Sequence, residues 1–240
     1  MITIEKLHKT FGKVDVLKGL DLEINSGGIF AVLGPNGSGK TTLIKSILGM
    51  VIPDKGDIKI KEKNILKTHD YRNSINYLPQ IANFPANLTV IELLQMIKDI
   101  RSKDANENYL IEIFGLEPFL KQKLGNLSGG TRQKVNLVLT FMFNSEIIIL
   151  DEPTTGLDPI SLLRLKELIK DEKEKGKTIL ITSHIMSFVE EISDEIVFLL
   201  DGKIYFKGSI QELKEQTNQT DLEHAIANIL TTKDAKDIKI

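Results

Sequence analysis

Short apolar runs alternate with amphipathic stretches along this chain, and their order predicts a layered α/β fold. The runs Gly28–Leu33, Ile147–Leu150 and Thr178–Thr182 consist mostly of apolar or β-branched residues, which is typical of buried strands in a parallel sheet. The first two are followed by stretches with helical spacing, Thr42–Met50 and Leu162–Lys173. Strands that alternate with helices in this way indicate a mostly parallel sheet.

The middle of the chain has a different pattern, because apolar residues recur there at helical spacing over a long range. The clearest examples are Val90–Ile97, Tyr109–Phe114 and Gln133–Phe143. We therefore expect a helical subdomain over about 81–144, inserted in an α/β core.

That core is expected over about 1–80 and 145–215, in a single domain that spans residues 1–240. Ser74–Pro79 reads as one more strand, and Glu195–Gly208 as a hairpin that turns at Asp201-Gly202. The tail over 216–240 is expected to add a helix, with Asp221–Leu230 as its clearest part.

Composition narrows the classes of function. Lys and Arg total 31 and Asp and Glu total 33, and this near-zero net charge argues against a protein that binds nucleic acid through a broad basic surface, as distinct from a local basic patch, so no nucleic-acid partner is expected. There are no cysteines, which excludes disulfides and thiolate metal sites and favours the reducing cytosol. The N-terminus lacks the pattern of a signal peptide, and no apolar stretch approaches the roughly 20 residues needed to span a bilayer.

A glycine-rich loop follows the first apolar run and precedes a predicted helix, which is the setting of a phosphate-binding loop. Glycines let backbone N–H groups approach phosphate oxygens, and the helix N-terminus favours an anion. Lys40 is expected to reach the β- and γ-phosphates, and the Thr41 hydroxyl to ligate magnesium. The alternative is an ordinary glycine turn. The predicted nucleotide-binding residues of the loop are Gly34, Pro35, Asn36, Gly37, Ser38, Gly39, Lys40, Thr41 and Thr42.

Two adjacent carboxylates end the apolar run Ile147–Leu150. A buried strand places its last residues at the carboxyl edge of the sheet, where α/β proteins bind ligands. Asp151 then suits a magnesium ion, and Glu152 suits a general base that polarises an attacking water. Such a pair at a strand end can also be merely solvated.

Ser128-Gly129-Gly130 precedes a predicted helix with apolar residues at helical spacing. Ser128 is expected to cap this helix, and the glycines leave room for a phosphate. The alternative is a helix cap without function. Because one nucleotide site already has a phosphate loop, this motif implies a site shared with a second copy of the chain.

These motifs resemble, in order, the Walker A, signature and Walker B motifs of the ATP-binding subunit of ABC transporters. The resemblance covers nearly the whole chain. Tyr77-Leu78-Pro79-Gln80 is similar to the Q-loop of that family, Gly156-Leu157-Asp158 to its D-loop, and Thr182-Ser183-His184 to the segment with its switch histidine.

The resemblance implies a P-loop NTPase core, with a mostly parallel sheet, an antiparallel β-subdomain and an inserted α-helical subdomain. It also implies ATP hydrolysis in a head-to-tail homodimer that holds two ATP molecules with Mg²⁺. In trans, each ATP would contact the signature residues Leu127, Ser128, Gly129, Gly130 and Thr131.

The resemblance further assigns roles to single residues. Gln80 would contact magnesium and sense a membrane partner, His184 would hold the γ-phosphate and attacking water, and Asp158 would link the two sites. Phe11 matches the aromatic residue that stacks on adenine, with Val16 nearby, although a core Phe is the alternative.

Two positions depart from the family pattern, namely Thr131 where Gln is usual and Phe11 where Tyr is commoner. The sequence Leu127–Val135 is similar to ATPases of the NosF-type copper or sulphur-compound transporters. The end of the chain near Ile240, without the regulatory domain of sugar importers, favours an exporter or a simple two-component system.

The expected partner is an integral membrane subunit that docks near Gln80–Leu88 and holds the protein at the cytoplasmic face of the cell membrane. Phe84 and Leu88 would line the docking groove, or alternatively pack in the core. A soluble ATPase of the same fold, in DNA repair or translation, is the main alternative. It is disfavoured because only about a hundred residues separate Lys40 from Asp151. A phosphate-loop kinase or GTPase is disfavoured because no guanine motif Asn-Lys-x-Asp occurs and because those proteins lack a counterpart of Ser128-Gly129-Gly130.

Overall fold

The structure is a computed structural model that describes residues 1–237, and it divides into two compact parts. One part, here the terminal part, combines residues 1–66 with the chain from Ser183 onward, and the other, the middle part, spans 67–182. These limits differ from the predicted subdomain over 81–144. Residues 238–240 of the predicted tail lie outside the described residues.

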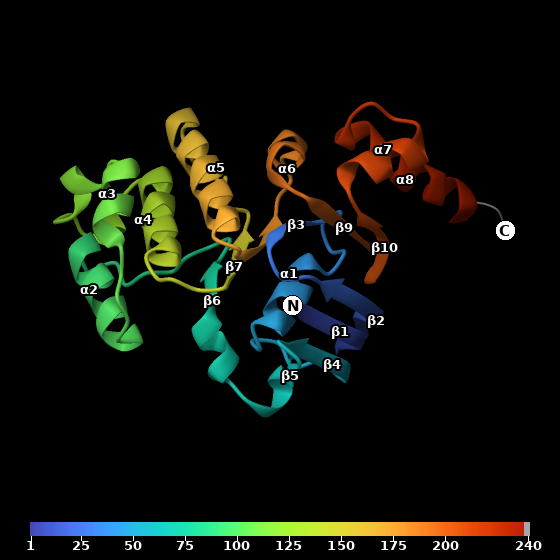
Figure 1. Ribbon diagram of the computed structural model, residues 1–240, viewed down its shortest axis with the longest axis horizontal. Helices are drawn as coiled ribbons and strands as arrows, with labels where there is room; N and C mark the ends of the chain where they lie inside the picture. Colours follow the sequence, from blue (N-terminus) through green and yellow to red (C-terminus); the bar gives the residue numbers. More distant parts are fainter. Residues whose placement is uncertain (238–240) are drawn as a thin grey trace. The chain divides into compact units, whose positions relative to one another are not determined.

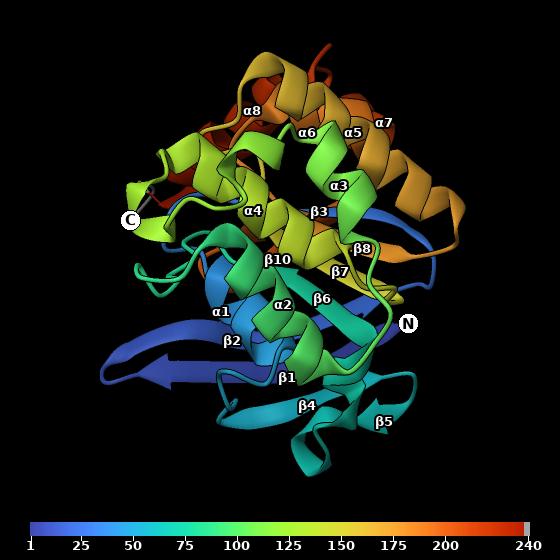
Figure 2. The same cartoon turned by 90° about the vertical axis from the view of Figure 1, so that its left-hand side faces the viewer.

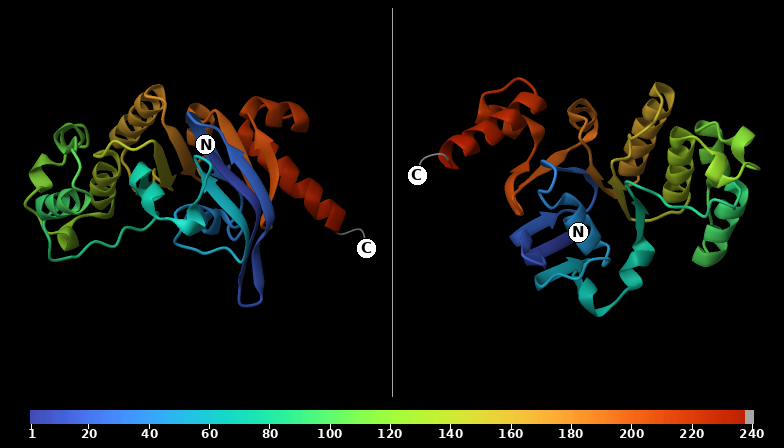
Figure 3. Two further views of the ribbon diagram at one scale, coloured as in Figure 1. Left: turned by 60° about the horizontal axis from the view of Figure 1, so that its bottom comes forward. Right: turned by 180° about the vertical axis from the view of Figure 1, so that it is seen from behind.

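The terminal part contains an antiparallel sheet in the order β2-β1-β4-β5. Pairing of β1 with β2 continues to Phe11 and Val14, whereas pairing of β1 with β4 ends at His8 and Lys55. The tip of the β1–β2 hairpin therefore projects past β4, as the left panel of Figure 3 shows. The strands are β1 (Ile2–Phe11), β2 (Val14–Ile24), β4 (Lys55–Ile60) and β5 (Lys63–Asn64).

A second group of strands in the terminal part includes the first predicted strand. β3 (Gly28–Leu33) pairs in parallel with β9 (Glu195–Leu200), and β9 pairs antiparallel with β10 (Lys203–Gly208). The turn of this hairpin has φ of 48° at Asp201 and 76° at Gly202. Two left-handed residues match the twist of the flanking strands, so the predicted hairpin is confirmed.

Four helices complete the terminal part: α1 (Lys40–Ile47), α6 (Met186–Ile192), α7 (Ile210–Thr217) and α8 (Leu222–Asp237). Figure 1 shows α7 and α8 side by side in the C-terminal region. The predicted helix Asp221–Leu230 corresponds to the first part of α8. α1 begins two residues before the prediction, because the helix starts inside the glycine-rich loop.

The middle part contains three parallel strands, β6 (Ile75–Leu78), β7 (Ile147–Asp151) and β8 (Thr178–Thr182). β7 is central, and every residue of β7 and β8 is buried. Because the strands are parallel, the end of β7 at Asp151 lies beside the end of β8 at Thr182. α5 (Pro159–Glu174) connects β7 to β8.

The remaining helices of the middle part lie together in Figures 1 and 2. They are α2 (Val90–Arg101), α3 (Glu107–Ile113) and α4 (Gly129–Phe141), all within the range predicted to be helical. α2 begins with a capping box, in which Thr89 and Glu92 satisfy each other's backbone N–H groups. Short 3₁₀ turns are η1 (Ile65–Lys67), η2 (Asp70–Ser74), η3 (Glu117–Phe119) and η4 (Leu124–Asn126). Over the described residues, no helix has the length and apolar character of a membrane span.

Candidate nucleotide site

The glycine-rich loop of the terminal part wraps around the side chain of Lys40. Its ammonium group donates to the carbonyl oxygens of Gly34 at 2.7 Å and Pro35 at 3.1 Å. Gly34 has φ of 148°, and an added Cβ would lie 2.1 Å from the Leu199 carbonyl oxygen, so only glycine fits. The loop therefore has the tight turn, the cation and the following helix that phosphate binding needs.

The loop leads directly into α1, whose N-terminal cap is Gly39 with φ of 107°. An added Cβ on Gly39 would lie 3.0 Å from the Val16 carbonyl oxygen, so β2 packs tightly on the start of the helix. Thr41 is exposed and Thr42 half-buried. The first N–H groups of α1, which have no partner within the helix, can therefore face an anion.

Phe11 lies at the projecting end of β1 and is 49% exposed. The alternative of a core Phe is therefore wrong for this position. The Lys9 ammonium lies 5.2 Å from the centre of its ring and pairs with Asp54 at 2.8 Å. Val16, on the facing strand, is half-buried. Phe11 thus offers an accessible aromatic surface.

In the middle part, Asp151 and Glu152 are held at the end of β7 by Thr182 of the neighbouring strand. The Thr182 hydroxyl donates to Asp151 Oδ1, and the Glu152 N–H donates to both oxygens of Thr182 at 3.1 Å. Asp151 is 4% and Glu152 7% exposed. Burial, together with the negative charge of Asp151, raises the pKa of Tyr77 to about 12.

Glu152 has φ of 52°, which is uncommon for a residue other than glycine. A left-handed backbone costs such a residue roughly 1–2 kcal/mol. Strain of this kind persists only where the surroundings impose it, and it clusters at functional sites. Here the bonds that the Glu152 N–H donates to Thr182 restrain the backbone at this position.

The predicted signature lies at the start of α4. The Ser128 hydroxyl caps the helix by accepting from the Thr131 N–H at 3.2 Å, and it also bonds the Thr131 hydroxyl at 2.9 Å. Ser128 and Gly129 are exposed. Gly130 approaches Gly156 so closely that an added Cβ would lie 2.6 Å from the Gly156 carbonyl oxygen. The cap was predicted, and the packing on the D-loop segment was not.

Residues of the predicted Q-loop, signature and D-loop motifs line one cavity of about 250 Å³ within the middle part. The Asn136 amide of α4 also donates to the Pro79 carbonyl at 3.3 Å, which fixes the start of the Q-loop segment. The cavity is lined by Gln80, Ile81, Ala82, Gly129, Gly130, Arg132, Gln133, Thr155 and Gly156.

Asp158 caps α5 and pairs with α4. Its carboxylate accepts from the N–H and hydroxyl of Ser161, both at 2.9 Å, and lies 2.7 Å from the Lys134 ammonium. Hydrogen bonds from Lys134 and from Ser161 hold the pKa of Asp158 well below its usual range. His184 is exposed and precedes α6 in the terminal part.

Sequence reasoning did not assign roles to Thr182, Gln133 or Lys134, although the structure places all three against motif residues. Thr182 has a detectable pattern, since it is a hydroxyl residue that ends a buried strand. Gln133 and Lys134 have no such pattern, because their partners lie about 20 residues away in sequence.

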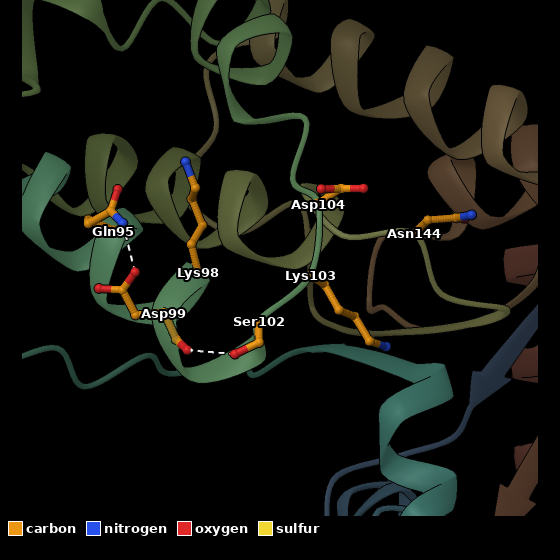
Figure 4. Close-up of a pocket in the computed structure, with 7 residues that line it drawn as sticks. All are labelled: Gln95, Lys98, Asp99, Ser102, Lys103, Asp104 and Asn144. Carbon is orange, nitrogen blue, oxygen red and sulfur yellow. Dashed lines mark hydrogen bonds between the residues drawn. The ribbon is translucent and has the colours of Figure 1, made fainter.

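A larger cavity of about 840 Å³ lies at the end of α2 and contains none of the motif residues (Figure 4). Its two lysines are engaged, Lys98 with Glu107 and Lys103 with the Asn73 carbonyl. Among the described residues, no group of three or more His, Cys, Asp or Glu could hold a metal ion by itself.

Comparison with known proteins gives consistent results. A family profile described as ABC transporter matches residues 17–155. The chain is 33% identical to the uncharacterized ABC transporter ATP-binding protein YhaQ of Bacillus subtilis, over 89% of this chain and 73% of that protein. It is 34% identical to the bacitracin transport ATP-binding protein BcrA of Bacillus licheniformis, over 91% and 73%. Other relatives are named as export or as probable import proteins.

Two solved structures share the fold over most of the chain. The ATP-binding subunit of an ABC transporter has a TM-score of 0.89 at 28% identity, covering 96% of this chain and 99% of that one. A dimeric ATP-binding cassette in a post-hydrolysis state, with ADP and Pi bound, has a TM-score of 0.79 at 25% identity, covering 88% and 99%.

Proposed function

The chain belongs to the ABC transporter family as an ATP-binding subunit with ATPase activity, and we propose that it hydrolyses ATP in a head-to-tail homodimer to drive a separate membrane subunit. One observation supports the proposed dimer. Ser128 and Gly129 are exposed at the capped N-terminus of α4, so a second chain can present its nucleotide to them. We also propose one nucleotide-binding domain over 1–240, with a helical subdomain over about 81–144.

ATP would bind first to the glycine-rich loop. Backbone N–H groups of the loop and of α1 would contact the phosphates, and Lys40 would exchange its two carbonyl partners for the β- and γ-phosphates. Phe11 would stack on adenine, with Val16 beside it, because its ring is accessible at the end of the β1–β2 hairpin. Thr41 is exposed beyond the loop and is the proposed hydroxyl ligand of magnesium.

The donor set fits Mg²⁺. This ion is usually held by one or two protein oxygens together with phosphates and water, and Asp151, Thr41 and Gln80 are the proposed ligands. The ion would supply charge stabilisation for the transferring phosphoryl group. Thr182 orients the Asp151 carboxylate, and the buried position of Asp151 limits competing hydration.

Glu152 is the proposed general base. The left-handed backbone and the bonds that its N–H donates to Thr182 would fix its position before nucleotide arrives, which is the preorganisation that catalysis requires. Its carboxylate would accept the proton of the attacking water. His184 would hold the γ-phosphate, and Asp158 would connect the two sites.

A mixing experiment tests the shared site. A Lys40→Ala chain and a Ser128→Arg chain are each expected to be inactive. In a mixed dimer, one site carries both lesions and the other carries neither, so part of the activity should return. No recovery at any mixing ratio would contradict a site shared in trans.

The membrane partner is proposed to dock near Gln80–Leu88. Ile81 is 74% exposed, and Phe84 and Leu88 are half-buried, so this segment offers apolar surface to a partner helix. The protein would then sit on the cytoplasmic face of the cell membrane. We propose export as the direction and the NosF-type ATPases as the subfamily, from the similarity of Leu127–Val135. Co-purification from solubilised membranes tests the partner.

A further inference from the structure

Asp54, in the loop before β4, holds the end of β1 where the hairpin begins to project. Pairing of β1 with β4 ends at His8. The Asp54 N–H donates to the His8 carbonyl at 2.9 Å. Its carboxylate accepts the Thr10 N–H at 2.7 Å and pairs with the Lys9 ammonium at 2.8 Å. One residue therefore contacts three consecutive positions of β1, directly before the exposed aromatic residue at its end.

The Lys9 side chain lies over the ring of Phe11. The pairing of β1 with β2 shifts register between Lys9 and Thr10, and an irregularity of this kind re-aims side chains. The Lys9 ammonium is 5.2 Å from the centre of the Phe11 ring, within the range of a cation–π interaction. The Lys9 side chain is only 16% exposed, whereas Phe11 is 49% exposed. Lys9 thus covers one face of the ring and leaves the opposite face to a ligand.

The Asp54 carboxylate keeps Lys9 in this place. Hydrogen bonds from Lys9 and Thr10 hold the pKa of Asp54 below its usual range, so the carboxylate is charged at neutral pH. An ammonium on a flexible stem has no preferred direction of its own. Because the Asp54 side chain is 43% exposed, the ion pair contributes little to stability. Its effect is to fix where the ammonium lies.

The hairpin that carries Phe11 is also attached to both ends of α1. At the start of the helix, an added Cβ on Gly39 would lie 3.0 Å from the Val16 carbonyl oxygen, so β2 packs against the phosphate loop. After the helix, the chain reaches Asp54 within seven residues of Ile47. The ring and the phosphate loop therefore belong to one framework within the terminal part.

We propose that Lys9 and Asp54 are positioning residues that hold the Phe11 ring in one orientation, with the face opposite Lys9 presented to the base of the nucleotide. This inference rests on the proposed function, in which Phe11 stacks on adenine. Neither residue would contact the phosphates. Loss of Lys9 should therefore weaken the binding of ATP but not of a ligand that consists of phosphates alone.

The test is Lys9→Met, which keeps the length of the side chain and removes its charge. Affinities are measured with magnesium present, by displacement of a fluorescent ATP analogue. ATP affinity should fall about 2- to 5-fold, the size expected for an exposed cation–π interaction, and tripolyphosphate affinity should stay unchanged. KM should rise by the same factor at unchanged kcat, as for lost uniform binding. Lys9→Arg should restore the affinity, because a guanidinium also stacks on aromatic rings and pairs with carboxylates.

A double-mutant cycle asks whether Lys9 acts through the ring. Phe11→Ala should weaken ATP binding about 5- to 150-fold, the range for loss of a base–aromatic stack. In that background Lys9→Met should have no further effect, since the group through which it acts is gone.

Two more variants complete the design. Asp54→Asn keeps an oxygen for the Thr10 N–H and removes the charge that holds Lys9, so it should reproduce Lys9→Met. Lys63→Met, at an exposed lysine of β5 on the far edge of the same sheet, should match the wild type. If a variant lowers the melting temperature, the ratio of the ATP and tripolyphosphate affinities decides, because a general loss of folded protein lowers both alike.

Unchanged ATP affinity in both Lys9→Met and Asp54→Asn would overturn the proposal. An equal loss for ATP and tripolyphosphate would also overturn it, since Lys9 would then attract the phosphates. So would a full effect of Lys9→Met in the Phe11→Ala background. Failure of the proposed function looks different. If Phe11→Ala binds ATP as tightly as the wild type, the adenine contact itself is wrongly assigned, whatever Lys9 does.

Discussion

The two glycines at the start of α4 are predicted to respond in opposite directions to the same substitution. Neither has the left-handed φ that would strain alanine, and both lie in the helix. An added Cβ on Gly129 has no atom within 4 Å, whereas on Gly130 it would lie 2.6 Å from the Gly156 carbonyl oxygen. Gly129→Ala and Gly130→Ala are therefore a matched pair that isolates the packing of α4 on the 153–158 segment.

The magnitudes follow from two opposing effects. Alanine is favoured over glycine in a helix by up to about 1 kcal/mol, which both variants gain in part. Overpacking against backbone costs about 1–3 kcal/mol, which only Gly130→Ala bears. Gly129→Ala should thus be slightly more stable than wild type, and Gly130→Ala less stable than Gly129→Ala by about 1–3 kcal/mol.

Urea unfolding without nucleotide measures this difference, followed by circular dichroism because the chain has no Trp. With a slope of about 3 kcal/mol per molar urea, the midpoints should differ by about 0.3–1 M. ATP hydrolysis should fall in both variants, since both glycines belong to the proposed signature. Equal midpoints would refute the reasoning, because the close approach of Gly130 to Gly156 would then impose no restraint.

Three other perturbations address the site and the partner, and one addresses pH. Glu152→Gln should abolish turnover but leave ATP binding nearly intact and trap an ATP-bound dimer; hydrolysis at the wild-type rate would rule out the general base. Lys40→Ala should weaken fluorescent-nucleotide binding, and unchanged affinity with magnesium present would contradict the phosphate loop. Phe84→Asp should stay folded, bind ATP and fail to co-purify with the membrane partner, whereas unfolding would make Phe84 a core residue. The hydrogen bond to Asp221 raises the pKa of His224. The stabilisation of α8 by this charged pair is therefore complete below about pH 6.5 and is lost as pH rises through the raised pKa of His224. An NMR titration should show a lower pKa of His224 in Asp221→Asn.

Local patterns were enough for much of the fold. β3 and β8 have the predicted bounds, because an apolar run between turn residues specifies a buried strand with little ambiguity. The hairpin turn at Asp201-Gly202 was predictable because few dipeptides accept two left-handed residues. α6 and α7 were not predicted, since seven or eight residues give too few turns for a clear helical period.

In the candidate site, too, contiguous motifs could be predicted from the sequence, whereas contacts between distant residues could not. The phosphate loop is a contiguous motif, so it can be recognised from the sequence alone. The motif includes a glycine at position 34, but only the structure shows the reason, which is that any side chain there would clash with the Leu199 carbonyl. The contacts around Glu152 are not contiguous. Thr182 lies 30 residues along the chain and Gln133 lies 19 residues back, and only parallel pairing of β7 with β8 and the path of α4 bring them together.

These contacts explain how a strained residue can be maintained at the end of β7. A left-handed Glu152 costs roughly 1–2 kcal/mol, and each net hydrogen bond returns about 0.5–1.5 kcal/mol. The bonds between Thr182 and Glu152 and between Gln133 and Pro153 together return about 1–3 kcal/mol, which is of the size needed to offset the strain. Loss of the Gln133 contact would leave the left-handed conformation nearly balanced against a relaxed one.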